Sequence, residues 1–169
     1  MIYYVVALAY DFSSSNSVRQ FRDFLFASLA LPLAFETSLM FWVMVSIDRE
    51  LVFPKAVDEF FPHWLDWMLH TNVSIFSILD ILVCRHQYPR RKSAIRGLTL
   101  FMLSYLILIY AGKLTTGIWV YGIIEVLTAP QRIAFFVICG LVTLGLYFIG
   151  EILNKLVSGR KTDVKVKEK

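Results

Sequence analysis

Four stretches of this sequence are apolar over roughly the length that an α-helix needs to cross a bilayer: residues 24–47, 64–83, 97–112 and 132–153. A helix satisfies its own backbone hydrogen bonds, which is what the hydrocarbon core requires of a spanning segment. The composition agrees, because 57% of the 169 residues are apolar. The sequence therefore predicts an all-α, multi-pass transmembrane helical bundle with about four full spans, and it excludes an ordinary soluble domain.

The remaining segments are shorter or more polar. Residues 1–10 are apolar but about half a span long, which predicts the second half of a transmembrane helix whose first half precedes this sequence. Residues 11–22 are expected to form a polar link, and the aromatic residues 117–127 to lie in the membrane interface or re-enter the membrane. We therefore predict a membrane-embedded helical domain over residues 1–156 and a basic, disordered tail over residues 157–169.

The distribution of charge predicts the orientation. Basic residues are concentrated in residues 85–96 and in the tail, and the two spans between them place both on the same side, which should be cytosolic. Lys165 and Lys167 near the C-terminus resemble a dilysine retrieval signal. We therefore expect an integral protein of the endomembrane system, in the endoplasmic reticulum or plasma membrane, with a cytosolic C-terminus. The charge is juxtamembrane, so no nucleic-acid partner is expected.

The span at residues 64–83 carries a polar stripe. Five polar residues recur at spacings of three and four, which places them on one face of an α-helix: Asp66, His70, Ser74, Ser77 and Asp80. Polar groups are costly in hydrocarbon, so this face should line the bundle interior or a wet cavity. We therefore expect the chemistry of the protein to lie here.

His70 and Asp66 are the candidate catalytic residues. Asp66 precedes His70 by one helical turn, where a carboxylate can fix the tautomer of the imidazole and support its positive charge. The nucleophile would be a serine or threonine hydroxyl from another helix. Alternatively, His70 is a buried histidine that is satisfied by Asp66 and performs no chemistry.

A metal site is a lesser alternative. His63, Asp66 and His70 are spaced three and four apart, so they could face one ion in an intramembrane metal-dependent hydrolase. His63 adjoins Pro62 at the edge of the expected helix, and this weakens the hypothesis. His86 is interpreted as a loop residue.

Other polar residues in the spans are candidates to line the same pocket. They are Glu36, Thr37, Thr71, Ser74 and Ser77. Glu36 lies near the middle of its span, where a charge costs roughly 2.5–3.5 kcal/mol, so it needs a partner, a proton or water.

Several short motifs together point to a known family. They are Asp48-Arg-Glu-Leu51 with Pro54-Lys55, Pro62-x-Trp64-Leu65, Met68-x-His70-Thr71, His86-x-Tyr88-Pro89, Gly117-x-Trp119-Val-Tyr121 and Gly150-Glu-x-Leu153-Asn154. In the order and spacing of these motifs, the chain resembles the family of the androgen-induced gene 1 protein and the androgen-dependent TFPI-regulating protein. The resemblance extends to about Leu156.

This resemblance implies a six-span endomembrane protein that hydrolyses fatty acid esters of hydroxy fatty acids with a threonine nucleophile and a histidine base. The family histidine corresponds to His70. The family threonine precedes the segment that corresponds to residues 2–12, so the sequence resembles an N-terminally shortened member. The implied partners are membrane lipids and a lipid ester substrate, with no cofactor. The alternative is a catalytically inactive or regulatory endomembrane protein.

Overall fold

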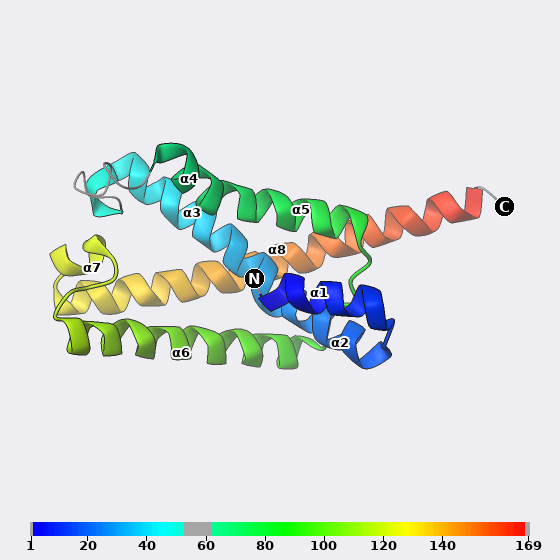
Figure 1. Cartoon of the computed structure of the whole chain (residues 1–169), viewed down its shortest axis with the longest axis horizontal. Helices are drawn as coiled ribbons and strands as arrows, with labels where there is room; N and C mark the ends of the chain where they lie inside the picture. Colours follow the sequence, from blue (N-terminus) through cyan, green and yellow to red (C-terminus); the bar gives the residue numbers. More distant parts are fainter. Residues whose placement is uncertain (1, 53–61, 168–169) are drawn as a thin grey trace.

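The computed structural model describes residues 2–52 and 62–167 as an elongated assembly of helices (Figure 1). The regular structure of these residues is entirely helical, so the all-α prediction is confirmed. Three helices are long and apolar enough to cross a membrane: Asn16–Ile47, Arg91–Thr116 and Ala129–Ser158. Many large apolar side chains on their outer faces are exposed, as expected for a surface that meets lipid.

The first two helices occupy most of the polar link that was expected over residues 11–22. α1 (Ile2–Ser13) and α2 (Asn16–Leu25) lie side by side, and the chain reverses at Ser14, whose φ of 48° is left-handed (Figure 1). The expectation of a link was wrong because polar residues can form a helix when tertiary contacts satisfy their charged groups. In α2 an arginine and an aspartate are buried in this way.

α2 continues without a break into η1 (Phe26–Ala30), which is one turn of π-helix, and then into α3 (Leu31–Ile47). Pro32 explains the wide turn, because proline has no N–H to donate and its ring would meet the carbonyl group four residues earlier. The short 3₁₀ turn η2 (Arg49–Leu51) follows α3.

The span expected at residues 64–83 is divided into three pieces that follow one another without a break. They are α4 (His63–Trp67), the π turn η4 (Met68–Asn72) and α5 (Val73–Val83). Together the pieces are about as long as a span, but this more polar region is not among the three apolar helices named above. π turns are frequent at functional sites, and this one contains His70.

The last part of the chain forms two long helices, with a short helix between them in the sequence. α6 (Arg91–Thr116) ends at Gly117, whose φ of 74° gives the left-handed cap that glycine adopts readily. α7 (Gly122–Val126) lies in the expected aromatic segment, and α8 (Ala129–Lys167) follows. α8 continues as a helix into residues 157–167, which belong to the predicted disordered tail. Disorder of this tail remains a prediction.

α3 is the central helix, because it packs against both α5 and α8. Two clusters of buried apolar side chains lie around η1 and the start of α6: Tyr3, Phe26, Leu31 and Ile81 in one, and Ala94, Leu98 and Tyr147 in the other. Next to the second cluster, α3, α6 and α8 leave a cavity between them.

Candidate functional site

A cavity of about 630 Å³ lies between α3, α6, α8 and the segment that leads into α7. Leucine, isoleucine, methionine and phenylalanine side chains form most of its wall. The polar lining residues are Glu36, Thr37, His70, Thr99, Tyr105 and Tyr121. A concave, mostly apolar space of this size with a few polar groups is typical of binding sites for small organic molecules.

His70 reaches the wall of this cavity from the π turn η4. Its Nδ1 lies 2.9 Å from the backbone carbonyl oxygen of Asp66 and 3.0 Å from the carboxylate Oδ1 of the same residue. Both neighbours are acceptors, so Nδ1 carries the proton of the neutral ring and Nε2 keeps its lone pair. The ring also stacks on Phe41, with centroids 4.0 Å apart and 7° between the planes. His70 is therefore oriented from two sides, by Asp66 and by Phe41.

α3 brings two of the other candidates, Glu36 and Thr37, to the same cavity. Thr37 lies one helical turn before Phe41, the ring that stacks on His70. Glu36 is buried and accepts a hydrogen bond from the hydroxyl of Thr143 in α8. Thr143 is thus the partner that a carboxyl group in the middle of a span requires.

Two tyrosines of the cavity were not candidates in the sequence. The hydroxyl groups of Tyr105 in α6 and Tyr121 before α7 are hydrogen-bonded to each other. Burial, followed by the hydrogen bond with Tyr105, raises the pKa of the Tyr121 phenol, so this group stays neutral and can donate a hydrogen bond. The aromatic character of residues 117–127 was the available signal, but it was attributed to membrane anchoring.

The other predicted pocket residues are not among those that line the cavity. Thr71 accepts a hydrogen bond from Nε1 of Trp42 at 3.1 Å. Ser74 donates to the carbonyl oxygen of Ala34 at 2.9 Å and so joins α5 to α3. Ser77 donates to the carbonyl oxygen four residues earlier in its own helix, at 2.8 Å. The polar stripe is therefore divided, because the wide π turn changes the face on which later residues lie.

The hypothesis of a metal site at His63, Asp66 and His70 is not tested, since the side chain of His63 lies outside the described part of the chain. Asp66 and His70 are close enough to share an ion. The described residues bring together a different set of three potential ligands, near the end of α5.

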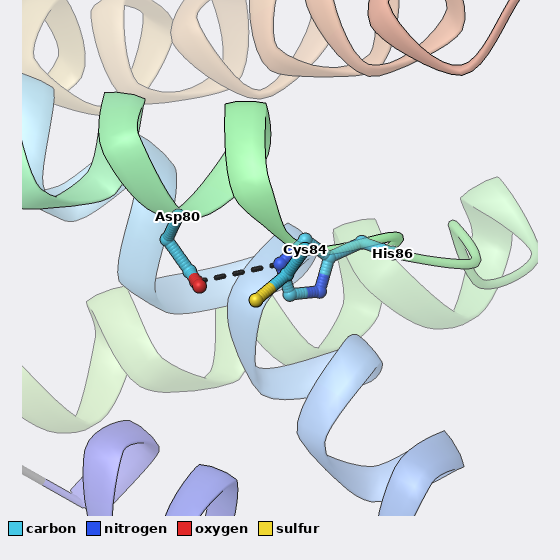
Figure 2. A group of neighbouring side chains, drawn as sticks. All are labelled: Asp80, Cys84 and His86. Atoms are coloured by element: carbon cyan, nitrogen blue, oxygen red, sulfur yellow. Dashed lines mark ion pairs between the residues drawn. The ribbon is translucent and has the colours of Figure 1, made fainter. Parts of the chain in front are cut away.

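This second polar cluster is centred on His86, for which the sequence predicted a loop position. His86 is buried, with 4% of its surface exposed, and its ring stacks on Phe26 at 3.8 Å. Nδ1 lies 3.1 Å from Oδ1 of Asp23, and Nε2 lies 3.3 Å from Oδ2 of Asp80, the ion pair drawn in Figure 2. Tyr3 donates a hydrogen bond to the same Asp80 carboxylate.

The electrostatics of His86 reflect two opposing effects. Burial favours the neutral ring, but the interactions with the carboxylates of Asp23 and Asp80 outweigh burial, so the pKa of His86 lies above its ordinary value. The sequence offered two signals for this cluster. Asp80 belongs to the polar stripe, and His86 belongs to the motif His86-x-Tyr88-Pro89. Nothing in their spacing, however, indicated that Asp23 would meet them.

Comparison with known proteins gives a consistent result. The family model described as FAR-17a/AIG1-like protein matches residues 1–155. The chain is 36% identical to the mouse androgen-dependent TFPI-regulating protein over 81% of its own length and 60% of that protein. It is 34% identical to the human androgen-induced gene 1 protein, over 80% of its own length and 57% of that protein. The chain thus spans about 60% of these relatives. No solved structure matches it.

Proposed function

We propose that the chain is part of a membrane hydrolase of fatty acid esters of hydroxy fatty acids. The premise is that the chain belongs to the FAR-17a/AIG1-like family, which its similarity over residues 1–155 shows. The observation that carries the proposal is the position of His70. It is paired with Asp66 and faces a largely apolar cavity between membrane helices. A general base at the wall of a largely apolar cavity is what ester hydrolysis within a bilayer requires.

The cavity suits the proposed substrate. Its apolar wall would hold the two hydrocarbon chains, and the polar groups are few enough to select one orientation of the ester. Tyr121 lines this cavity, and its neutral phenol can donate a hydrogen bond. Such a hydrogen bond would stabilise the negative charge that develops on the carbonyl oxygen of the ester. Glu36 is already hydrogen-bonded to Thr143, so we assign it no proton transfer.

In the proposed reaction, Nε2 of His70 takes the proton of a threonine hydroxyl as its oxygen attacks the ester carbonyl. The alkoxide leaving group takes this proton and departs as the hydroxy fatty acid, which leaves an acyl-threonine. His70 then removes a proton from water, and the resulting attack releases the fatty acid and restores the threonine. Asp66 stabilises the imidazolium that forms in both steps.

The threonine can be assigned in two ways. The family resemblance implies one that precedes residues 2–12 and so lies outside this sequence. Within the described residues, Thr37 lines the same cavity as His70 and lies one turn from the ring that stacks on it. Thr99 lines the cavity from α6.

The test is hydrolysis of a fatty acid ester of a hydroxy fatty acid by membranes that contain the 169-residue chain. We expect His70→Ala to abolish turnover, whereas Ser104→Ala, on the exposed face of α6, leaves it unchanged. Loss of activity in Thr37→Val would assign the nucleophile to this chain. Full activity in His70→Ala, at an equal level of protein in the membrane, would refute the proposal.

A regulatory role is the second candidate. In the described residues the His70 ring hydrogen-bonds to Asp66 and to no hydroxyl group, so no nucleophile is aligned with it. Some relatives are named TFPI-regulating proteins, and this name also favours a regulatory role. This role predicts no ester hydrolysis and no labelling of the chain by a fluorophosphonate probe.

We further propose that residues 85–96 and the C-terminus are cytosolic and that the protein resides in the endoplasmic reticulum or plasma membrane. The basic charge of these segments supports this orientation. A protease that reaches a C-terminal epitope tag in sealed microsomes, without detergent, would agree with it. Protection of the tag would reverse the orientation.

A further inference from the structure

Three side chains at the end of α5 converge on one point. Asp80 lies in the last turn of α5, Cys84 caps it, and His86 lies in the loop that leads to α6 (Figure 2). One carboxylate oxygen of Asp80, Sγ of Cys84 and one ring nitrogen of His86 lie within 4.8 Å of one another. In the part of the chain that the structure describes, this is the single group of three potential metal ligands so closely placed.

His86 is arranged as a metal-binding histidine is. Its Nδ1 lies 3.1 Å from Oδ1 of Asp23, so this carboxylate holds the ring from one side. Nε2 is buried, has no well-aligned hydrogen bond among the described residues, and lies 3.3 Å from Oδ2 of Asp80. Metal-bound histidines commonly donate their second ring N–H to a carboxylate, and Asp23 occupies that position.

The spacing of the donor atoms suits a small tetrahedral ion. Two ligands that are each about 2.0–2.1 Å from zinc at a tetrahedral angle lie about 3.3 Å apart. The observed separation of Nε2 and Oδ2 is 3.3 Å. One nitrogen, one oxygen and one sulfur donor favour Zn²⁺ over Mg²⁺ or Ca²⁺, which prefer oxygen ligands.

The cluster is not sealed from the surface. An open groove on the surface reaches two of the three donors, and its lining residues are Tyr4, Phe76, Leu79, Asp80, Val83 and Cys84. None of the three donors lines the larger cavity that contains His70. The cluster is therefore separate from the proposed hydrolase site and does not depend on it.

We propose that Asp80, Cys84 and His86 bind one Zn²⁺ ion, with Asp23 positioning His86. Without metal, His86 lies between two carboxylates, and Cys84 carries a thiol. Zinc is bound by a thiolate and a neutral imidazole, so binding displaces the thiol proton and any proton on Nε2. The ion ties the end of α5 to the following loop and, through Asp23, to α2.

Two neighbouring groups are compatible with the ion. Arg22 is paired with Asp23 at 2.7 Å, so its positive charge is already balanced. Tyr3 donates a hydrogen bond to Asp80 and would keep this carboxylate oriented.

The test is metal binding by the purified full chain in detergent, with Co²⁺ as a spectroscopic substitute for Zn²⁺. We expect one ion per chain and a thiolate-to-cobalt charge-transfer band. The chain has two cysteines, so Cys139→Ser leaves Cys84 as its only thiol and should keep both the band and the zinc affinity. Cys84→Ser should lose the band and weaken zinc binding by at least ~10-fold, and Asp23→Asn by about 10–100-fold.

A variant of His70 distinguishes this site from the cluster of His63, Asp66 and His70. His70→Gln removes a ligand of that cluster, and it should bind zinc as the wild type does. Loss of zinc in His70→Gln, or zinc retained in Cys84→Ser, would overturn the proposal. Should Cys84→Ser fail to fold, the folded Cys139→Ser variant still decides, because no charge-transfer band in it would also overturn the proposal.

Discussion

Replacing Gly150 by alanine should destabilise the bundle, although alanine is the better helix former. Gly150 lies in α8 where this helix meets α3 and the loop before α6. A Cβ atom there would lie 2.5 Å from Cδ2 of Leu31 and 2.8 Å from the hydroxyl oxygen of Tyr88. Both distances are well below the roughly 3.5–4.0 Å of favourable contacts. Leu31 is 1% exposed, so its side chain has no free space into which to move.

The expected magnitude follows from two opposing effects. Overpacking a filled site costs about 1–3 kcal/mol, whereas alanine in place of glycine within a helix contributes about 0.5–1 kcal/mol of stability. For Gly150→Ala we expect a net loss of about 1–2 kcal/mol in the free energy of unfolding. Gly145 is the matched control in the same helix, because its Cβ would meet no atom within 4 Å. Gly145→Ala should gain about 0.5–1 kcal/mol.

The assay is unfolding of both variants in the same detergent, by heat or by a denaturing detergent, followed by helical circular dichroism. The sign of the difference is the test, since the two changes are chemically identical. A Gly150→Ala protein that is as stable as Gly145→Ala would show that α8 does not approach Leu31 and Tyr88 as described.

Gly150 belongs to the same sequence motif as Glu151 and Asn154, and the close approach of α8 explains why the three residues act together. Glu151 pairs with Arg91 at 2.9 Å, and Asn154 donates a hydrogen bond to the backbone carbonyl oxygen of His86 at 3.1 Å. The three residues therefore lie on the face of α8 that docks against η1 and the residues around the start of α6. The glycine permits the close approach that brings the two polar contacts into range.

Three other predictions test the polar groups. Asp66→Asn keeps the backbone contact to the histidine ring but removes the charge that supports an imidazolium, so ester hydrolysis should fall about 10-fold or more in the same membrane assay. Thr143→Val leaves Glu36 without its partner and should cost about 1–3 kcal/mol in detergent unfolding, whereas Thr143→Ser should restore it. Because the two neighbouring carboxylates raise the pKa of His86 above that of the unfolded chain, its contribution to stability is complete below about pH 6.5 and is lost as the pH rises through the higher folded pKa. With a metal chelator present, unfolding followed as the pH rises above about 6.5 should show this loss in the wild type and a flatter profile in His86→Gln.

Interactions between residues close in the chain could be predicted from the sequence. Asp66 and His70 are four residues apart, and any helical turn brings their side chains together, so this pair follows from spacing alone. The apolar stretches likewise predicted an all-helical chain, because hydrocarbon leaves few other ways to satisfy the backbone. Glu36 and Thr37 line the cavity, and polar groups within a span generally avoid lipid.

Contacts between distant segments depended on the tertiary structure. Thr143 meets Glu36 across 107 positions, and neither local spacing nor composition indicates that partner. The π turn at Met68–Asn72 divides the polar stripe, because one wide turn rotates all later residues, and a strict helical period does not foresee it. The cluster around His86 joins α2, α5 and a loop in the same way. Sequence periodicity specifies which face of a helix a residue occupies, but only the packing of helices decides what that face meets.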